Sequence, residues 1–150
     1  MFLPKRYKIV KGIGKSVYPL VAFDSALQNA GIGDYNLVKV SSILPAACQY
    51  TEDIDLAKGS ILYAAYATTT VLVGQSASVG VAIAKAQSSE ENGVIFEHTA
   101  LDDTTNILKK MCISAMDNRD RKIDYINVCT QTIYGEENLY VSAIAAVVMW

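Results

Sequence analysis

Strand-like segments far outnumber helical ones in this chain, and this imbalance limits the folds that it can adopt. Runs rich in β-branched and small apolar residues predict about seven strands, whereas only two segments have helical spacing. The predicted strands are 6–10, 36–43, 60–73, 78–86, 93–100, 122–134 and 139–150, and the predicted helices are 23–33 and 102–118. Two helices cannot cover both faces of one large parallel sheet. The sequence therefore predicts an α+β fold of packed, antiparallel-rich sheets flanked by helices.

Composition fits a single folded domain over residues 1–150, because half of the chain (51%) is hydrophobic and 19% is charged. The net charge of −2 gives no electrostatic case for binding nucleic acid. The apolar run at 141–150 is too short to cross a membrane. The cysteines, at positions 48, 112 and 129, form no CxxC pair. We therefore expect no metal site, and free thiols in a reducing cytoplasm.

The segment 11–19 is predicted as a loop, and its "GIGKS" resembles the end of a phosphate-binding loop. The complete pattern requires a glycine at position 9, where the chain has Ile9, so a nucleotide site is not expected. In the helix predicted for 23–33, Asp24 or Ser25 is expected near the N-terminus and Gly31 just after the C-terminus. In the helix predicted for 102–118, a core face is expected from the residues Ile107, Leu108, Met111, Ala115 and Met116.

Glu97 lies inside the apolar strand "VIFEH". Strict alternation places Val94, Phe96 and His98 on one face of this strand, and Ile95 and Glu97 on the other. Partial burial beside Ile95 would raise the tendency of the carboxyl group to hold a proton and suit it to donate one. A carboxylate that meets solvent at a strand end explains the position equally well. His98 is the single histidine, which leaves a histidine-based triad or metal cluster without its other members.

Two further polar residues have both a structural and a functional interpretation. Asp24 can cap a helix, and it can also present an oxygen to a cationic ligand. Asn36 can be a turn residue that enters a strand, or its amide can hold a nearby carbonyl group in a strained position. Spacing alone does not choose between these interpretations.

The pair Ser41-Ser42 ends a predicted strand in "VKVSSILP". Turn chemistry at a strand end is the simple explanation. The alternative is self-cleavage: a serine hydroxyl attacks the preceding carbonyl group, and the acyl group moves from nitrogen to oxygen. The resulting ester is lost by β-elimination, and hydrolysis of the dehydroalanine leaves a pyruvoyl group. This chemistry needs a distorted peptide and a stabilised oxyanion, which the surrounding fold must supply.

The segment "FDSALQNAGIGDYNLVKVSSILP" (23–45) resembles the self-cleavage region of the pyruvoyl-dependent arginine decarboxylases. "GVIFEH" (93–98) is similar to the strand that carries the proton-donating glutamate of that family, and "SAIAAVVMW" (142–150) to its C-terminal strand. The resemblance implies a four-layer αββα sandwich, self-cleaved between Ser41 and Ser42 into two chains. It also implies homotrimers with active sites between the subunits.

The resemblance also implies a role for each matching residue. Ser42 is the precursor of the pyruvoyl group, Asn36 assists processing, and Glu97 is the general acid. Asp24 receives the guanidinium group of the substrate, a geometry that favours a bidentate pair. After cleavage, the new carboxylate of Ser41 adds negative charge to the substrate site.

The implied reaction converts L-arginine to agmatine and CO2 through an imine with the pyruvoyl group, which takes the place of pyridoxal phosphate. Because the reaction consumes a proton, both polyamine synthesis and acid resistance are open as physiological roles. Two alternatives remain at this stage. The substrate can be another amino acid such as histidine, since Asp24 would also accept an imidazolium group, or the chain can be an unprocessed structural relative.

Overall fold

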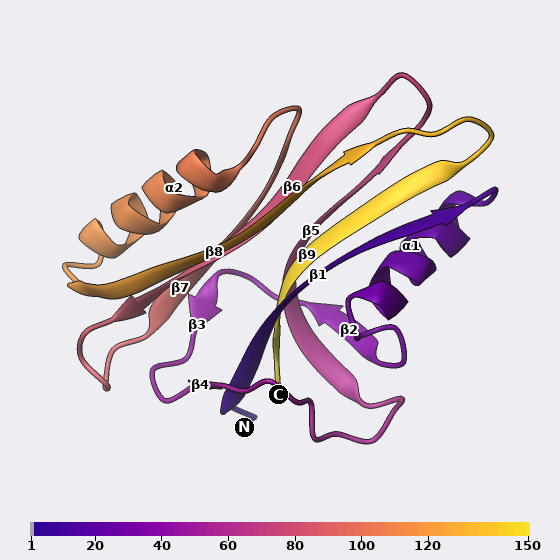
Figure 1. Ribbon diagram of the computed structural model, residues 1–150. Coiled ribbons are helices and arrows are strands. Elements are labelled where there is room, and N and C mark those ends of the chain that lie inside the picture. Colours follow the sequence, from indigo (N-terminus) through magenta and orange to yellow (C-terminus); the bar gives the residue numbers. More distant parts are fainter. Residues whose placement is uncertain (1) are drawn as a thin grey trace.

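The computed structural model describes residues 2–150 and is α+β, with two helices and two mostly antiparallel sheets among these residues (Figure 1). One sheet has five strands in the order β2-β5-β9-β1-β4, and the other has four in the order β3-β7-β6-β8. The helices are α1 (Pro19–Asn29) and α2 (Thr105–Asp117). The strands are β1 (Arg6–Ser16), β2 (Asn36–Lys39), β3 (Ile43–Leu44), β4 (Gln49–Tyr50), β5 (Ile61–Val71), β6 (Ser76–Ala86), β7 (Gly93–Ala100), β8 (Ile123–Tyr134) and β9 (Tyr140–Met149).

Strands β6 and β9 are buried along most of their length because each sheet is covered on both faces. Alternate side chains of β9, from Val141 to Met149, join the inward side chains of β6 in a core between the sheets. The intervening residues of β9, such as Ile144 and Val148, face α1, and those of β6, such as Ala82 and Ala84, face α2. The small and β-branched residues of these strands therefore pack against the opposite sheet on one face and against a helix on the other.

Helix α2 lies against the four-stranded sheet, and its core face differs in part from the sequence prediction. Leu108, Ala115 and Met116 are buried as predicted, together with Cys112. Ile107 was predicted on this face but is exposed. The apolar stripe is centred about one residue further along the helix than the prediction placed it, so Ile107 falls at its solvent edge.

The predicted loop at 11–19 is wrong, since β1 continues to Ser16. Its two glycines lie under helix α1: a Cβ on Gly12 would be 2.2 Å from the carbonyl oxygen of Ala26, and one on Gly14 would be 2.2 Å from the amide nitrogen of Ala26. The glycines therefore permit a close helix–sheet approach in a regular strand. The "GIGKS" sequence therefore belongs to strand β1 and does not form a phosphate-binding loop.

Helix α1 also begins earlier than predicted, at Pro19, with Tyr18 as its N-cap residue. Proline suits the first helical position because its missing N–H needs no intrahelical partner there. The predicted capping role of Asp24 is therefore wrong, because this residue lies inside the helix. The predicted C-terminal signal is confirmed: Gly31 has a φ of 76°, and the amide of Ile32 donates to the carbonyl oxygen of Leu27 at 3.0 Å.

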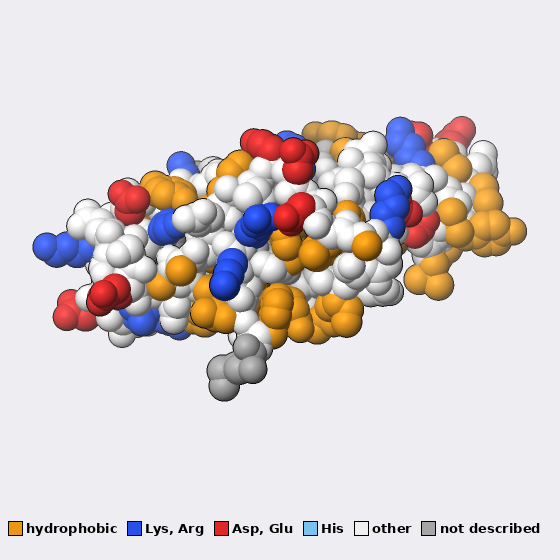
Figure 2. All heavy atoms as spheres, turned by 90° about the horizontal axis from the view of Figure 1, so that it is seen from below, with side chains coloured by type: hydrophobic (Ala, Val, Ile, Leu, Met, Phe, Trp, Pro, Cys, Tyr) orange, Lys and Arg blue, Asp and Glu red, His pale blue; other side chains and the backbone are white. Residues whose placement is uncertain are grey.

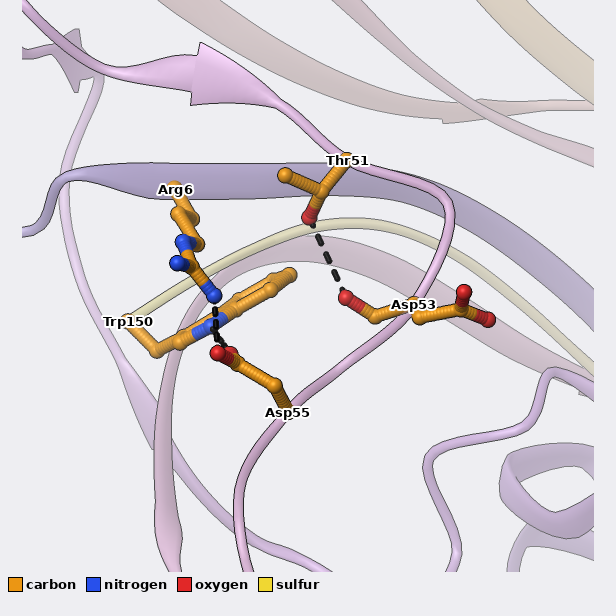
Figure 3. Close-up of polar contacts among 5 residues, drawn as sticks. All are labelled: Arg6, Thr51, Asp53, Asp55 and Trp150. Carbon is orange, nitrogen blue, oxygen red and sulfur yellow. Dashed lines mark hydrogen bonds and ion pairs between the residues drawn. The ribbon is translucent and has the colours of Figure 1, made fainter.

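The C-terminal Trp150 is hydrogen-bonded to the start of β1 and to the connection before β5 (Figure 3). Its indole N–H donates to Asp55 at 2.8 Å, and the same carboxylate forms an ion pair with Arg6. The Arg6 guanidinium, with help from the Trp150 indole, holds the pKa of Asp55 below its usual value. The connection 44–59 was predicted to be irregular, and most of it is, apart from the short strands β3 and β4 at Leu44 and at Gln49–Tyr50.

The surface carries charges of both signs, and hydrophobic side chains gather along one edge in the view from below (Figure 2). Some large apolar residues are strongly exposed, among them Tyr18, Leu20 and Leu101. Within residues 2–150, we find no helix with the length and apolar character needed to span a membrane.

Candidate active site

The peptide bond between Ser41 and Ser42 lies in the connection from β2 to β3, where the chain passes from one sheet to the other. Figure 1 shows this connection. The predicted strand 36–43 is in fact two strands. The amide of Val40 donates to the carbonyl oxygen of Ala64 in the five-stranded sheet at 3.0 Å. The carbonyl oxygen of Ser42 accepts from the amide of Ile95 in the four-stranded sheet at 2.8 Å. Two fixed points on different sheets therefore bracket the Ser41–Ser42 bond.

Strand β7 places Glu97 close to this crossing. Ile43 pairs with Val94, so the antiparallel register brings the Ser41–Ser42 segment alongside the residues just before Glu97. Ile95 packs in the core between the sheets, and alternation directs Glu97 to the same face. The side chain of Glu97 is 29% exposed, which favours the partly buried position over the solvent-exposed strand end, the two interpretations that the sequence left open.

Lys39 is the ionic partner of Glu97, with its Nζ 3.6 Å from Oε1 of the carboxylate. The same ammonium lies 4.8 Å from the ring centroid of Tyr66. Lys39 comes two residues before Ser41, on β2, so its ion pair with Glu97 on β7 links the five-stranded sheet to the four-stranded sheet. Sequence reasoning missed this residue, although a lysine inside the strand that leads to the serine pair is a visible signal.

A cavity of about 300 Å³ opens beside Ser41. Its lining is mostly apolar, and the rings of Phe2 and Tyr63 stack over part of it with centroids 5.1 Å apart. The remaining lining residues are Pro4, Val40, Ile43, Pro45 and Met149. The cavity gives the serine pair an apolar neighbourhood with room for a small ligand.

Two predicted site residues lie away from this crossing in the single chain. Asn36 opens β2, and its amide donates to the carbonyl oxygen of Gly59 at 2.8 Å. It is five residues from Ser41, about 16 Å along an extended strand. Asp24 is exposed on α1, where it accepts a hydrogen bond from Gln28 at 2.7 Å. The structure therefore brings together Ser41, Ser42 and Glu97, but not Asp24 and Asn36.

The cysteines and the histidine lie outside the crossing. Cys48 and Cys112 are buried free thiols, and burial raises the pKa of each to about 11. Cys129 is partly buried and also free, with a pKa raised by burial. His98 is partly buried on β7. Within residues 2–150, no three His, Cys, Asp or Glu side chains are grouped to hold a metal ion.

Comparison with known proteins identifies the family to which this chain belongs. A family model described as pyruvoyl-dependent arginine decarboxylase matches residues 6–150. The chain belongs to this family. The predicted resemblance is thereby confirmed, and so is its main functional consequence: the chain is an enzyme of the decarboxylase class that depends on a pyruvoyl cofactor made from its own residues.

The matching relatives cover almost the whole chain. A protein of Methanopyrus kandleri named pyruvoyl-dependent arginine decarboxylase is 35% identical over 153 residues, which are 100% of this chain and 99% of the relative. A protein of the same name from Methanococcus aeolicus is 32% identical, over 98% of this chain and 90% of its own. One from Thermococcus kodakarensis is 31% identical, over 98% and 96%.

The surroundings of residue 42 fit a pyruvoyl group at this position. Its carbonyl oxygen is held by the amide of Ile95, so the residue keeps an anchor that does not depend on its bond to Ser41. Ser42 itself is partly buried, and the partly buried carboxylate of Glu97 follows on the adjacent strand. A carboxyl group next to a reacting centre is a common means of proton transfer in enzymes.

Proposed function

We propose that the chain cleaves itself between Ser41 and Ser42, and that the fragment beginning at residue 42 decarboxylates L-arginine to agmatine. The observation that carries this proposal is the position of the serine pair. The bond to be broken is the link between two separately hydrogen-bonded strands, beside a cavity and a carboxylate. Breaking it leaves each end attached to its own sheet.

In the proposed cleavage, Oγ of Ser42 attacks the carbonyl carbon of Ser41 and the C–N bond between them breaks, giving an ester. β-Elimination breaks the Cβ–Oγ bond of residue 42, removes its α-proton and releases Ser41 as a carboxylate. Water then replaces the nitrogen of the dehydroalanine, which leaves as ammonia, and a pyruvoyl group remains. No external oxidant or reductant is needed.

Glu97 is the proton donor in the proposed reaction. The pyruvoyl group supplies the electron-accepting carbonyl that amino-acid decarboxylation requires. Glu97, on the strand beside residue 42, delivers a proton to the carbon that has lost CO2. The ion pair with Lys39 holds its carboxylate at the crossing, and the partial burial of Glu97 limits competing solvent. Water then breaks the bond between the product amine and the cofactor, so the amine leaves with the added proton on its former α-carbon and the ketone is restored.

Substrate recognition needs a second copy of the chain. Asp24 is the proposed partner of the guanidinium group, and α1 presents it to solvent away from Ser42 within one chain. We propose homotrimers in which Asp24 of a neighbouring copy completes each site with the Ser41 carboxylate. Exposed apolar residues such as Tyr18, Leu20 and Val21, at the start of α1, support a contact surface there.

The remaining parts of the proposal concern architecture and processing. The order α1, five-stranded sheet, four-stranded sheet, α2 is proposed as the four-layer sandwich of the family. Asn36 is proposed to assist processing by fixing the start of β2 through its bond to the Gly59 carbonyl. A cytoplasmic location fits the free thiols.

Intact-mass measurement of the purified protein tests the proposal. We expect fragments of residues 1–41 and 42–150, and borohydride with arginine should trap an arginine-derived amine on the larger one. Ser42→Ala should remain a single chain and trap nothing, whereas Ser89→Ala in an exposed turn should behave as the unaltered protein. An uncleaved, inert protein, or cleavage of Ser42→Ala at the same bond, contradicts the proposal.

A panel of amino acids tests the choice of substrate. Arginine should be decarboxylated with a kcat/KM at least about 100-fold above that of histidine or lysine, because a bidentate carboxylate–guanidinium pair cannot form with either. Faster turnover of histidine would assign the site to the other substrate while leaving the cleavage chemistry intact.

A further inference from the structure

Strand β3, which directly follows residue 42, is very short, so only a few hydrogen bonds attach it to the four-stranded sheet. Strand β3 contains only Ile43 and Leu44, and Leu44 pairs with Gly93 at the start of β7. The next contact comes from a side chain. The amide of Ala46 donates to Oδ1 of Asn92 at 2.9 Å.

Asn92 is itself fixed from another direction. Its carbonyl oxygen accepts a hydrogen bond from the Arg121 guanidinium at 2.7 Å, and it directly precedes the first residue of β7. The residue is exposed, so its side chain has no role in the hydrophobic core. Its position connects the end of the α2 region to the segment that follows β3.

Cleavage after Ser41 makes these contacts more important, because residue 42 becomes a chain end. Chain ends fray unless hydrogen bonds or packing tie them down. The hydrogen bonds that attach residues 42–46 come from the Ile95 amide at one end, the two residues of β3, and Asn92 at the other end, and the Leu44 side chain packs in the core between the sheets. If the Asn92 bond is lost, the ladder ends at Leu44, so residues 45 and 46 are held less firmly to β7.

We infer that Asn92 is a positioning residue for residue 42, both before cleavage and in the cleaved enzyme, acting through Ala46 and β3. This inference rests on the proposed function. Asn92 touches neither the serine pair nor Glu97 through any hydrogen bond or ion pair among the described residues, so its effect is on geometry and not on chemistry. The group that matters is its side-chain oxygen, which is an acceptor that aspartate also has and leucine lacks.

The variants Asn92→Leu and Asn92→Asp, compared with Asn106→Leu on the exposed face of α2, test the inference. One lost hydrogen bond is worth roughly a threefold to tenfold change in an equilibrium. We expect Asn92→Leu to lengthen the half-time of cleavage by about that factor, measured by intact mass, and Asn92→Asp and Asn106→Leu to cleave like the unaltered chain. In the cleaved form of Asn92→Leu, kcat for arginine should fall while KM stays within about twofold of the unaltered enzyme.

Amide hydrogen exchange gives a readout that does not depend on activity. The amide of Ala46 should lose protection in Asn92→Leu and keep it in Asn92→Asp, in both the cleaved protein and uncleaved Ser42→Ala. Asn92→Ala removes the same acceptor with a smaller side chain and has the same expected result, so misfolding of one variant does not decide the matter.

The outcomes separate this inference from the proposed function. If the unaltered chain never cleaves, the proposed function fails. If it cleaves, but Asn92→Leu and Asn92→Ala cleave at the same rate with Ala46 still protected, the positioning role is wrong and the proposed function stands. Slow cleavage of Asn92→Asp together with Asn92→Leu would also overturn the role of the acceptor oxygen.

Discussion

Residues 1–41 and 42–150 are two differently charged parts of one folded unit. The first part has six Lys and Arg against two acidic residues, whereas the second has seven against thirteen. The formal charges are therefore +4 and −6, which sum to the net −2 of the whole chain. Opposite charges attract over distances of about a Debye length, so the two parts are electrostatically complementary before any contact is considered.

Each of the four ion pairs found among residues 2–150 joins one part to the other. They connect Arg6 with Asp55, Lys15 with Glu136, Lys39 with Glu97, and Asp34 with Lys58. Because most of these side chains are about half exposed, each pair contributes little by itself. The main attachment is β1, which pairs with β9 from Tyr7 to Ser16. A chain cut at the sheet crossing can therefore stay folded as two fragments.

The largest expected effect comes from removing the first part altogether. Residues 42–150 alone lack β1, α1 and β2, so β9 loses one of its two partner strands, β5 loses β2, and one face of the five-stranded sheet loses its cover. We expect no cooperative thermal unfolding of this fragment by circular dichroism, and recovery when residues 1–41 are co-expressed. A fragment that melts cooperatively with native-like strand content would show that the first part is dispensable for folding.

Glu97→Gln separates the chemistry of the second part from its attachment to the first. Cleavage should proceed to completion, since the serine pair and its hydrogen bonds are unchanged. Turnover of arginine should fall by about 10²- to 10⁴-fold, the usual contribution of a general acid. Steady-state CO2 release measures this, with Glu137→Gln, an exposed residue in a turn, as the control. Turnover near that of the control would remove Glu97 from the acid role.

Asp24→Asn tests whether the first part also contributes to the substrate site. A lost charged partner for the guanidinium group should raise KM for arginine about 10-fold or more, with kcat changed less. The melting temperature should stay within about one or two degrees, because Asp24 is exposed inside α1 and does not cap it. A lower melting temperature with an unchanged KM would restrict Asp24 to a structural role.

The smallest effect is expected from the ion pair at the end of the molecule. The Arg6 and Trp150 contacts lower the pKa of Asp55 in the folded protein. Their stabilisation is therefore complete above the ordinary aspartate pKa of about 4, and it is lost as the pH falls through the lower folded value. Asp55→Asn should melt slightly below the unaltered protein at pH 7 and at the same temperature near pH 2. A constant difference across this range would show that the charge is not responsible.

Local patterns in the sequence were sufficient for several parts of the fold. The strand at 93–100 has the predicted bounds, and its alternation correctly put Ile95 on the opposite face from Val94: Ile95 packs between the sheets and Val94 packs with α2. Gly31 has the left-handed conformation expected after a helix. These features depend on the periodicity of strands and helices or on one residue's backbone freedom, which neighbouring residues already encode.

Other features required the tertiary structure. Gly12 and Gly14 look like loop residues in the sequence, and only the approach of α1 explains why they lie in a strand. The bonds from Val40 to Ala64 and from Ile95 to Ser42 make one predicted strand into two. Contacts between residues far apart in the chain decide these points, and no local pattern contains them.

The sequence by itself was sufficient to indicate the family of pyruvoyl-dependent decarboxylases, because the motif around Ser41 and Ser42 and the glutamate in "VIFEH" are local patterns. The tertiary structure decided that the serine pair lies between two sheets, that Lys39 forms an ion pair with Glu97, and that the Asn92 side chain accepts a hydrogen bond from Ala46, just after β3. The physical reason is that a local pattern involves only neighbouring residues, whereas the distances between residues far apart in the chain depend on how the two sheets pack.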